Sequence, residues 1–127
     1  LDERAYRNLK INATPSVSVR IHSKQGSVEF EDGVNANLSF IADALIEPQF
    51  DNKVFTIVGH TDTTGEPQYN EDLSVRRAKT IYQKIVAHAP SLADKINIVG
   101  KGETLPLYEE NDDIERMLNR RIELKLE

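Results

Sequence analysis

The sequence predicts an α/β fold, a two-layer sandwich in which a mixed β-sheet carries helices mainly on one face. Apolar residues alternate as in strands at one set of segments and recur every three or four residues at another. The strand-like segments are 17–22, 54–58, 96–99 and 121–126, and the helix-like ones are 34–45 and 70–88. Strands separated by helices favour parallel pairing, whereas an initial hairpin and a final strand with no following helix favour antiparallel pairing.

Length and composition predict one globular domain. The chain has 127 residues, of which 39% are hydrophobic and 29% charged, enough for one core. We expect residues 1–14 to be a lead-in or linker that ends at Thr14-Pro15, and residues 15–127 to form the domain. The chain has 16 Lys and Arg against 21 Asp and Glu and no dense basic stripe. Nucleic acid is therefore not an expected partner.

The sequence holds no segment that predicts a direct membrane contact. No apolar run reaches the roughly 20 residues that span a bilayer. Because the chain begins at Leu1 and not at Met, we expect a processed or truncated piece, tethered to a membrane only through a segment absent from this sequence. The absence of cysteine excludes disulfides and thiolate metal sites and is compatible with any compartment.

The first half of the chain predicts a hairpin, a helix and a central strand. Residues 17–22 alternate, Lys24-Gln25-Gly26 supplies a turn, and the alternation resumes at Val28 and Phe30. A helix with an Asx cap fits 34–45. The nearly continuous apolar run 54–58 is typical of a strand covered on both faces.

The second half predicts a long helix, two strands and an acidic loop. Asn70 caps a helix that runs to about His88, with acidic residues in its first turn. A helical turn at 91–94 and a strand at 96–99 follow, and then a polar, acidic, exposed loop. A short helix at 114–118 precedes a last strand with one wet face.

Helix phase singles out Arg77 in the long helix. With residues placed at 100° intervals, Arg77 falls within the apolar arc that includes Leu73 and Ile81, whereas Arg76 faces water. An arginine that points toward a core needs an anion or must reach the rim, because an unpaired buried charge is costly. Arg77 is therefore a candidate anion binder.

Asp62 is the second candidate, because it follows the predicted central strand. Ligands of α/β sheets commonly bind beyond the carboxyl ends of parallel strands, and the loop to the long helix returns Arg77 to the same edge. The two side chains either pair with each other, as buried opposite charges usually do, or stand apart. Standing apart, Asp62 accepts from an ammonium and Arg77 donates to a carboxylate, which suits a zwitterionic headgroup.

Five ordered blocks resemble the C-terminal OmpA-like domain, a family that includes the peptidoglycan-associated lipoprotein and the stator proteins of flagellar motors. The resemblance covers roughly residues 28–126. The blocks are Gly59-His60-Thr61-Asp62-Thr63-Thr64-Gly65, Tyr69-Asn70, Leu73-Ser74-Val75-Arg76-Arg77-Ala78, Gly102-Glu103 with Pro106, and Asn119-Arg120-Arg121-Ile122-Glu123.

The resemblance implies non-covalent binding of peptidoglycan through the diaminopimelate of its stem peptide. Asp62 matches the residue that holds the ammonium, and Arg77 matches the residue that holds the carboxylate. Supporting roles are expected for Thr61, Gly65, Asn70, Leu73, Arg121 and Asp32. Arg121 can equally be structural, covering the sheet edge or pairing with Glu103 or Asp72. The acidic loop from Glu109 to Asp113 departs from the family pattern and has no assigned purpose.

We expect no enzyme, catalytic residue, metal or cofactor. His60 and Asp62 lack a third ligand or a nucleophile in a recognisable pattern. The resemblance implies a periplasmic domain that tethers an envelope protein, held in the outer or inner membrane, to the cell wall. The alternative is a periplasmic protein-interaction or oligomerisation domain of the same fold without wall binding. Whether the domain forms a homodimer stays open.

Overall fold

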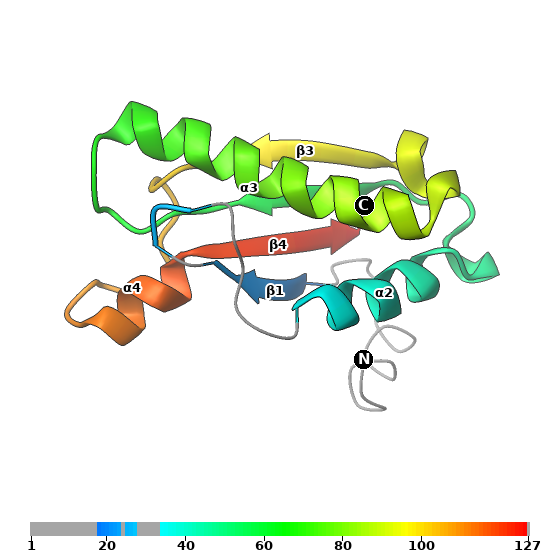
Figure 1. Ribbon diagram of the computed structural model, residues 1–127, viewed down its shortest axis with the longest axis horizontal. Coiled ribbons are helices and arrows are strands. Elements are labelled where there is room, and N and C mark those ends of the chain that lie inside the picture. The colour runs from blue at the N-terminus through cyan, green and yellow to red at the C-terminus, as the bar shows by residue number, and fades with distance from the viewer. Residues whose placement is uncertain (1–17, 24, 28–33, 127) are drawn as a thin grey trace.

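The computed structural model describes residues 18–23, 25–27 and 34–126 of the chain, and Figure 1 shows their arrangement. Strands and helices alternate along most of this length. The strands are β1 (Ser18–His22), β2 (Phe55–Gly59), β3 (Ile96–Gly100) and β4 (Arg121–Leu126). The α-helices are α2 (Val34–Leu45), α3 (Pro67–His88) and α4 (Asp113–Asn119), and the 3-10 helices are η1 (Pro48–Phe50) and η2 (Pro90–Lys95).

The four described strands form one mixed sheet in the order β1-β4-β2-β3. β2 pairs parallel with β3, and β4 pairs antiparallel with both β1 and β2. β1, β2 and β3 therefore run in one direction, and their carboxyl ends meet at the edge where β4 begins (Figure 1). We call this edge the carboxyl edge of the sheet. The mixed sheet confirms the predicted fold class.

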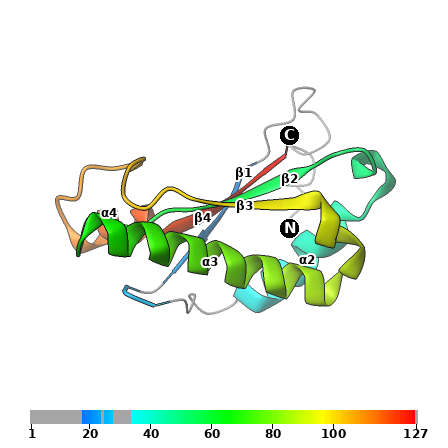
Figure 2. The same cartoon turned by 90° about the horizontal axis from the view of Figure 1, so that it is seen from above.

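The helices α2 and α3 lie on the same face of the sheet, as the view along the sheet in Figure 2 shows. Between the layers lies a continuous apolar core, contributed by α2, β2, α3 and β4 together with β1 and the two 3-10 helices. Its most deeply buried members are Ala42, Phe55, Ile57, Ala78, Ile81, Ile85, Leu92 and Ile122. The two-layer sandwich with helices mainly on one face is therefore as predicted.

Two paired glycines let α3 approach the sheet closely. Gly59 ends β2, Gly100 ends β3, and the two are neighbours in the parallel register. A Cβ on Gly59 would overlap the backbone carbonyl of Ser74, and a Cβ on Gly100 would overlap Ser74 and Val75 of α3. The Ser74 hydroxyl, which donates to Glu71 O, also accepts from Gly102 N at 3.0 Å. The glycines thus fix α3 against the carboxyl edge.

Most predicted elements are confirmed within a few residues, but the start of α3 is wrong. The helix begins at Pro67, three residues earlier than predicted, and Asn70 lies inside it with its N–H bonded to Glu66 O. No acidic residue lies in the first turn. Proline suits the first helical position because its fixed φ is helical and no N–H is needed there.

The wet face predicted for β4 is also wrong, because Lys125 alone among its six residues is exposed. β4 lies between β1 and β2. The charged side chains of Arg121 and Glu123 on the other face are buried and bonded to each other at 2.8 Å. Charged residues at every second position predicted a solvent-facing side of the strand, but a buried ion pair gives the same sequence pattern. Four expectations lie outside the described residues: the linker 1–14, the strand at Val28 and Phe30, the cap before α2, and Asp32.

Candidate functional site

Three charged side chains gather at the carboxyl edge: Asp62, Arg77 and Arg120. Asp62 follows β2, Arg77 lies in the middle of α3, and Arg120 lies between α4 and β4. A fourth segment, the turn that follows β1, contributes the backbone carbonyls of Ser23 and Ser27. We call the three charged residues the edge cluster.

The Asp62 carboxylate is buried and held on both oxygens. Only 4% of Asp62 is exposed. Its Oδ1 accepts from Thr64 N at 2.9 Å, and its Oδ2 accepts from Arg120 at 2.9 Å. The bond to Thr64 N closes a local turn that fixes the carboxylate relative to the loop. The ion pair that the structure records for Asp62 is thus with Arg120, an arrangement that neither sequence alternative included.

Arg77 is fully buried, as the helix phase predicted, and Arg76 beside it is exposed. The Arg77 Nε donates to Ser27 O at 2.8 Å. Burial lowers the pKa of Arg77 to about 10, the Asp62 charge opposes that shift, and the Arg120 charge adds to it. Desolvation is thus the largest influence on the pKa of Arg77.

Arg120 is the residue that sequence reasoning missed, since Arg121 was chosen from the same block. Arg120 joins Asp62 through its guanidinium and donates from Nε to Ser23 O at 3.2 Å. No local pattern identifies it. Arg120 lies between α4 and β4, with a φ of -78° and a ψ of 80°, so the alternation of β4 does not extend to it.

The supporting residues Thr61, Gly65, Asn70 and Leu73 lie around Asp62 or in the adjoining turns of α3. Thr61 donates from its N–H to Gly102 O and from its hydroxyl to Asp62 O, both at 2.9 Å. Asn70, 1% exposed, donates to Asp62 O and to Glu103. Gly65 has a φ of 94°, which favours glycine. Leu73 is buried.

Arg121 takes part in a different buried group, which we call the strand cluster: His60, Arg121 and Glu123. Arg121 donates to Glu123 at 2.8 Å and to Leu105 O at 3.0 Å. His60 Nε2 lies 3.1 Å from Glu123 Oε1. The ion pair that the structure records for Arg121 is with Glu123, which was not among the expected partners. Glu103, which was, accepts from Asn70.

Burial and charge shift two pKa values in the strand cluster. Burial lowers the pKa of His60 to about 4, helped by the charge of Arg121 and opposed by that of Glu123. Burial alone raises the pKa of Glu123, but the charge and hydrogen bond of Arg121 outweigh it and hold that pKa below its ordinary value. At neutral pH the strand cluster therefore contains one cation, one anion and a neutral imidazole.

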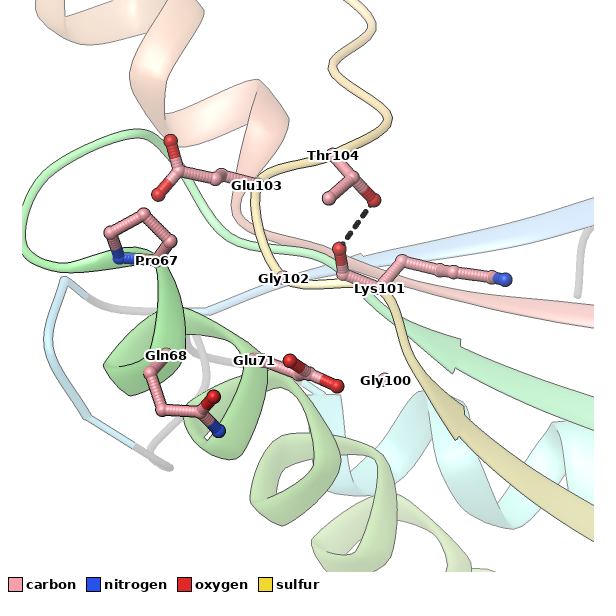
Figure 3. Close-up of a pocket in the computed structure, with 8 residues that line it drawn as sticks. All are labelled: Pro67, Gln68, Glu71, Gly100, Lys101, Gly102, Glu103 and Thr104. Carbon is pink, nitrogen blue, oxygen red and sulfur yellow. Dashed lines mark hydrogen bonds between the residues drawn. The ribbon is translucent and has the colours of Figure 1, made fainter.

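A cleft of about 350 Å³ lies next to the edge cluster and is lined by other residues. Figure 3 shows the first turns of α3 on one side and the loop after β3 on the other. The lining residues are Pro67, Gln68, Glu71, Gly100, Lys101, Gly102, Glu103 and Thr104. Asn70 connects the two places, because its amide bonds both Glu103 of the cleft and the backbone of Asp62.

The chemistry of the edge cluster suits a ligand that carries both charges. Asp62, Arg77 and Arg120 bring one carboxylate and two guanidinium groups to this edge, and a guanidinium matches a carboxylate with two parallel hydrogen bonds. The Asp62 carboxylate offers acceptors to a cation. Among the described residues, no group of three or more His, Asp or Glu could hold a metal ion.

The structure is thus an α/β domain with a cluster of charged side chains at the carboxyl edge of its sheet. Comparison with known proteins agrees, since residues 24–120 match the OmpA family. The chain therefore belongs to the OmpA family. Domains of this family are binding domains and not enzymes, which confirms that expectation.

Among curated proteins, the chain resembles outer membrane porin F of Pseudomonas aeruginosa, with 33% identity over 92 residues. It also resembles the peptidoglycan-associated lipoprotein of the same species, with 37% identity over 67 residues. The matches cover 72% and 53% of this chain but only 26% and 39% of those relatives. The chain thus spans well under half the length of either relative.

Two solved structures share the fold at 23% sequence identity. The peptidoglycan-associated lipoprotein of Burkholderia pseudomallei has a TM-score of 0.72 and covers 85% of this chain and 89% of its own. The cell wall anchor of the type VI secretion system from Pseudomonas aeruginosa has a TM-score of 0.75 and covers 97% and 94%. Across the part of the chain that the structure describes, no helix combines the length and apolar character needed to cross a membrane.

Proposed function

We propose that this domain binds peptidoglycan non-covalently through the diaminopimelate of the stem peptide. The observation that carries the proposal is the convergence of Asp62, Arg77 and Arg120 at the carboxyl edge, where separate elements bring a buried carboxylate and two guanidinium groups together. Membership of the OmpA family supports it. So do relatives whose names describe a peptidoglycan-associated lipoprotein and a cell wall anchor.

Arg77 is the proposed partner of the ligand carboxylate. Its guanidinium is rigid, forked and always charged at neutral pH, and it matches a carboxylate with two parallel hydrogen bonds. It is fully buried at the carboxyl edge, and burial lowers its pKa to about 10. A ligand carboxylate meets this guanidinium in a site from which water is largely excluded, which strengthens the interaction.

Asp62 is the proposed partner of the ligand ammonium, with Arg120 as its companion in the free domain. Thr64 N holds one carboxylate oxygen of Asp62, and Arg120 holds the other. Each carboxylate oxygen has two lone pairs, so an ammonium can share an oxygen with the donor already present. A preformed pair also keeps the Asp62 carboxylate oriented before the ligand arrives, which lowers the cost of binding.

The proposal is tested by pulldown with purified sacculi. Asp62→Ala and Arg77→Ala should each lose binding by a few kcal/mol, because each leaves one ligand charge unpaired in a desolvated site. Arg76→Ala, which removes an exposed arginine from the same helix, is the matched control and should bind as wild type does. Sacculi binding by folded Asp62→Ala and Arg77→Ala at the wild-type level would refute the proposal.

Ligand selectivity gives a second test. Stem peptides that carry lysine in place of diaminopimelate lack the side-chain carboxylate, so Arg77 would stay without its ligand partner. Isothermal titration with the two soluble peptides should give a clear affinity difference in wild type. In Arg77→Ala that difference in affinity should shrink, because the side chain that binds the ligand carboxylate has been removed.

The ion pair between Asp62 and Arg120 also favours a second candidate, a protein-interaction domain of the same fold without wall binding. A buried aspartate already bonded on both oxygens can be purely structural. That candidate predicts no sacculi binding by wild type, and an unfolding free energy that falls in Asp62→Ala. Wall binding by wild type together with its loss in folded Asp62→Ala excludes it.

On this proposal the domain works in the periplasm and tethers an envelope protein to the wall. The names of several relatives place them in the outer membrane, and others are described as periplasmic domains. A tether also requires a membrane-held part elsewhere in the protein. Fractionation of the full-length protein with and without lysozyme digestion of the wall tests this arrangement.

A further inference from the structure

The acidic loop before α4, which the family resemblance leaves without a purpose, bonds directly to the loop that carries Asp62. Glu110 reaches across the carboxyl edge to Thr63, the residue after Asp62. Its Oε1 accepts from the Thr63 hydroxyl at 2.7 Å and from Thr63 N at 3.1 Å. Its Oε2 lies 3.2 Å from Thr63 N and accepts from the Asn119 amide at 2.8 Å.

Asn119 fixes the loop that presents Glu110. This side chain is fully buried. Its Oδ1 accepts from Leu107 N at 2.9 Å and from Tyr108 N at 3.1 Å, and its Nδ2 donates to Tyr108 O at 3.0 Å. Four hydrogen bonds, including the one to Glu110, therefore fold the segment 107–110 around one amide. The position of the Glu110 carboxylate is set by this framework and not by an exposed, rotatable side chain alone.

The Glu110 carboxylate thus bonds to the chain neighbour of Asp62 and to the chain neighbour of Arg120, the two members of an ion pair. Thr63 follows Asp62, and Asn119 precedes Arg120. One carboxylate bonded to Thr63 and to Asn119 holds the two backbones at a fixed separation, and the Asp62–Arg120 pair spans the same gap at 2.9 Å. We infer that Glu110 is a positioning residue, whose carboxylate sets the placement of the Asp62–Arg120 pair and so orients the Asp62 carboxylate for the ligand ammonium.

The remaining acids of the loop support the same arrangement. Asp112 caps α4 by accepting from Glu115 N at 2.8 Å, and Glu115 accepts from Asn111 N at 3.0 Å. These bonds fix the start of α4, the helix that ends at Asn119.

This inference rests on the proposed function for its ligand but has a readout that needs no ligand. Amide hydrogen exchange, measured by NMR, reports the bonds to Thr63 N and Thr64 N directly. Glu110→Ala should speed exchange at Thr63, which loses its acceptor. It should also speed exchange at Thr64, whose bond to Asp62 depends on the loop staying in place. Glu109→Ala, a neighbouring exposed acid, is the matched control and should leave both rates unchanged.

Ligand binding then tests the consequence of that positioning. Titration with a soluble diaminopimelate stem peptide should show an affinity loss of about tenfold in Glu110→Ala. This size is taken by analogy from residues that orient metal-binding side chains, at the lower end of their range. Glu110→Gln should recover part of it, because one amide oxygen can still accept from Thr63. Thr63→Val combined with Glu110→Ala should lose little more than Glu110→Ala alone, since the two residues act through one contact.

The outcomes separate the two proposals. Unchanged exchange at Thr64 in Glu110→Ala overturns the positioning role whatever the ligand results are. Wild-type affinity in Glu110→Ala, with binding lost in Arg77→Ala, overturns the role in binding and leaves the proposed function intact. Absence of peptide and sacculi binding by wild type refutes the proposed function, while faster Thr64 exchange would still support Glu110 as the residue that positions Asp62.

Discussion

The edge cluster and the strand cluster both bury arginine beside carboxylate, yet they differ in where their members come from. The strand cluster pairs Arg121 with Glu123 on β4 itself and adds His60, neutral at neutral pH. The edge cluster brings Asp62, Arg77 and Arg120 together from three separate segments. An ion pair between two residues of one strand suits structure, and charged residues that meet at a junction of loops suit a ligand.

The largest expected effect is on stability, from Arg121→Ala. It would leave Glu123 buried without its ion-pair partner, and breaking a buried pair from one side costs about 3 to 5 kcal/mol. Urea unfolding should show this loss in the free energy of unfolding, while Arg76→Ala should change it little. A loss under about 1 kcal/mol would mean that water reaches Glu123 and that the strand cluster is not closed.

The second effect is a dependence of stability on pH that originates in His60. The unfolded chain binds a proton at this histidine near pH 6.5, and the folded chain only near pH 4. Acid therefore favours the unfolded state, and stability falls as the pH drops from 6.5 to 4, by up to about 3 kcal/mol. The lowered pKa of Glu123 adds a further loss of stability at pH values below the ordinary pKa of a glutamate. Protonation of Glu123 there removes the negative charge that pairs with Arg121.

Unfolding curves measured between pH 7 and pH 4 check this dependence. His60→Asn should flatten the decline, because no imidazole then needs to be buried without a proton. His88→Asn serves as the control, since that side chain is 41% exposed and bonded to Asp43 at the surface. An equal decline in wild type and His60→Asn would assign the acid sensitivity to other groups.

More of the fold than of the site could be predicted from the sequence. Periodicity was sufficient for the strands, for α2 and for the phase of α3, because burying one face of an element forces a regular spacing of apolar residues. It placed Arg77 correctly. The start of α3 was missed because a capping residue at Asn70 competed with Pro67, and proline at a first helical position looks like a loop residue in sequence.

The partners of charged residues could not be predicted in the same way. Arg120 and Arg121 are neighbours in the chain, but Arg120 bonds to Asp62 and Arg121 bonds to Glu123. Only the register of β4 in the sheet distinguishes them. The role of Glu110 depends on a contact 47 positions away in sequence, with Thr63. Such contacts are set by how loops meet at the carboxyl edge, and local patterns carry no signal for that.

A smaller stability effect is expected from Arg120→Ala in the edge cluster. Asp62 would lose one partner but keep the bond from Thr64 N, and the Arg120 side chain is 12% exposed, so water can partly replace it. We expect a loss of about 2 kcal/mol in unfolding free energy, below that of Arg121→Ala. A loss as large as that of Arg121→Ala would show that the edge cluster is as closed to water as the strand cluster.

The smallest stability effect, and the sharpest contrast between the clusters, is expected from Arg77→Met. Methionine fills a similar volume without a charge, and Asp62 keeps Arg120 and Thr64 as partners. The substitution also removes the desolvation penalty of the buried guanidinium, the penalty that lowers the pKa of Arg77.

The bond to Ser27 O is lost, but Ser27 is half-buried and water can reach it. We expect an unfolding free energy within about 1 kcal/mol of wild type, measured in urea, together with complete loss of sacculi binding. A large destabilisation would mean that Arg77 is structural in the way that Arg121 is, and it would favour the second candidate function over ligand binding.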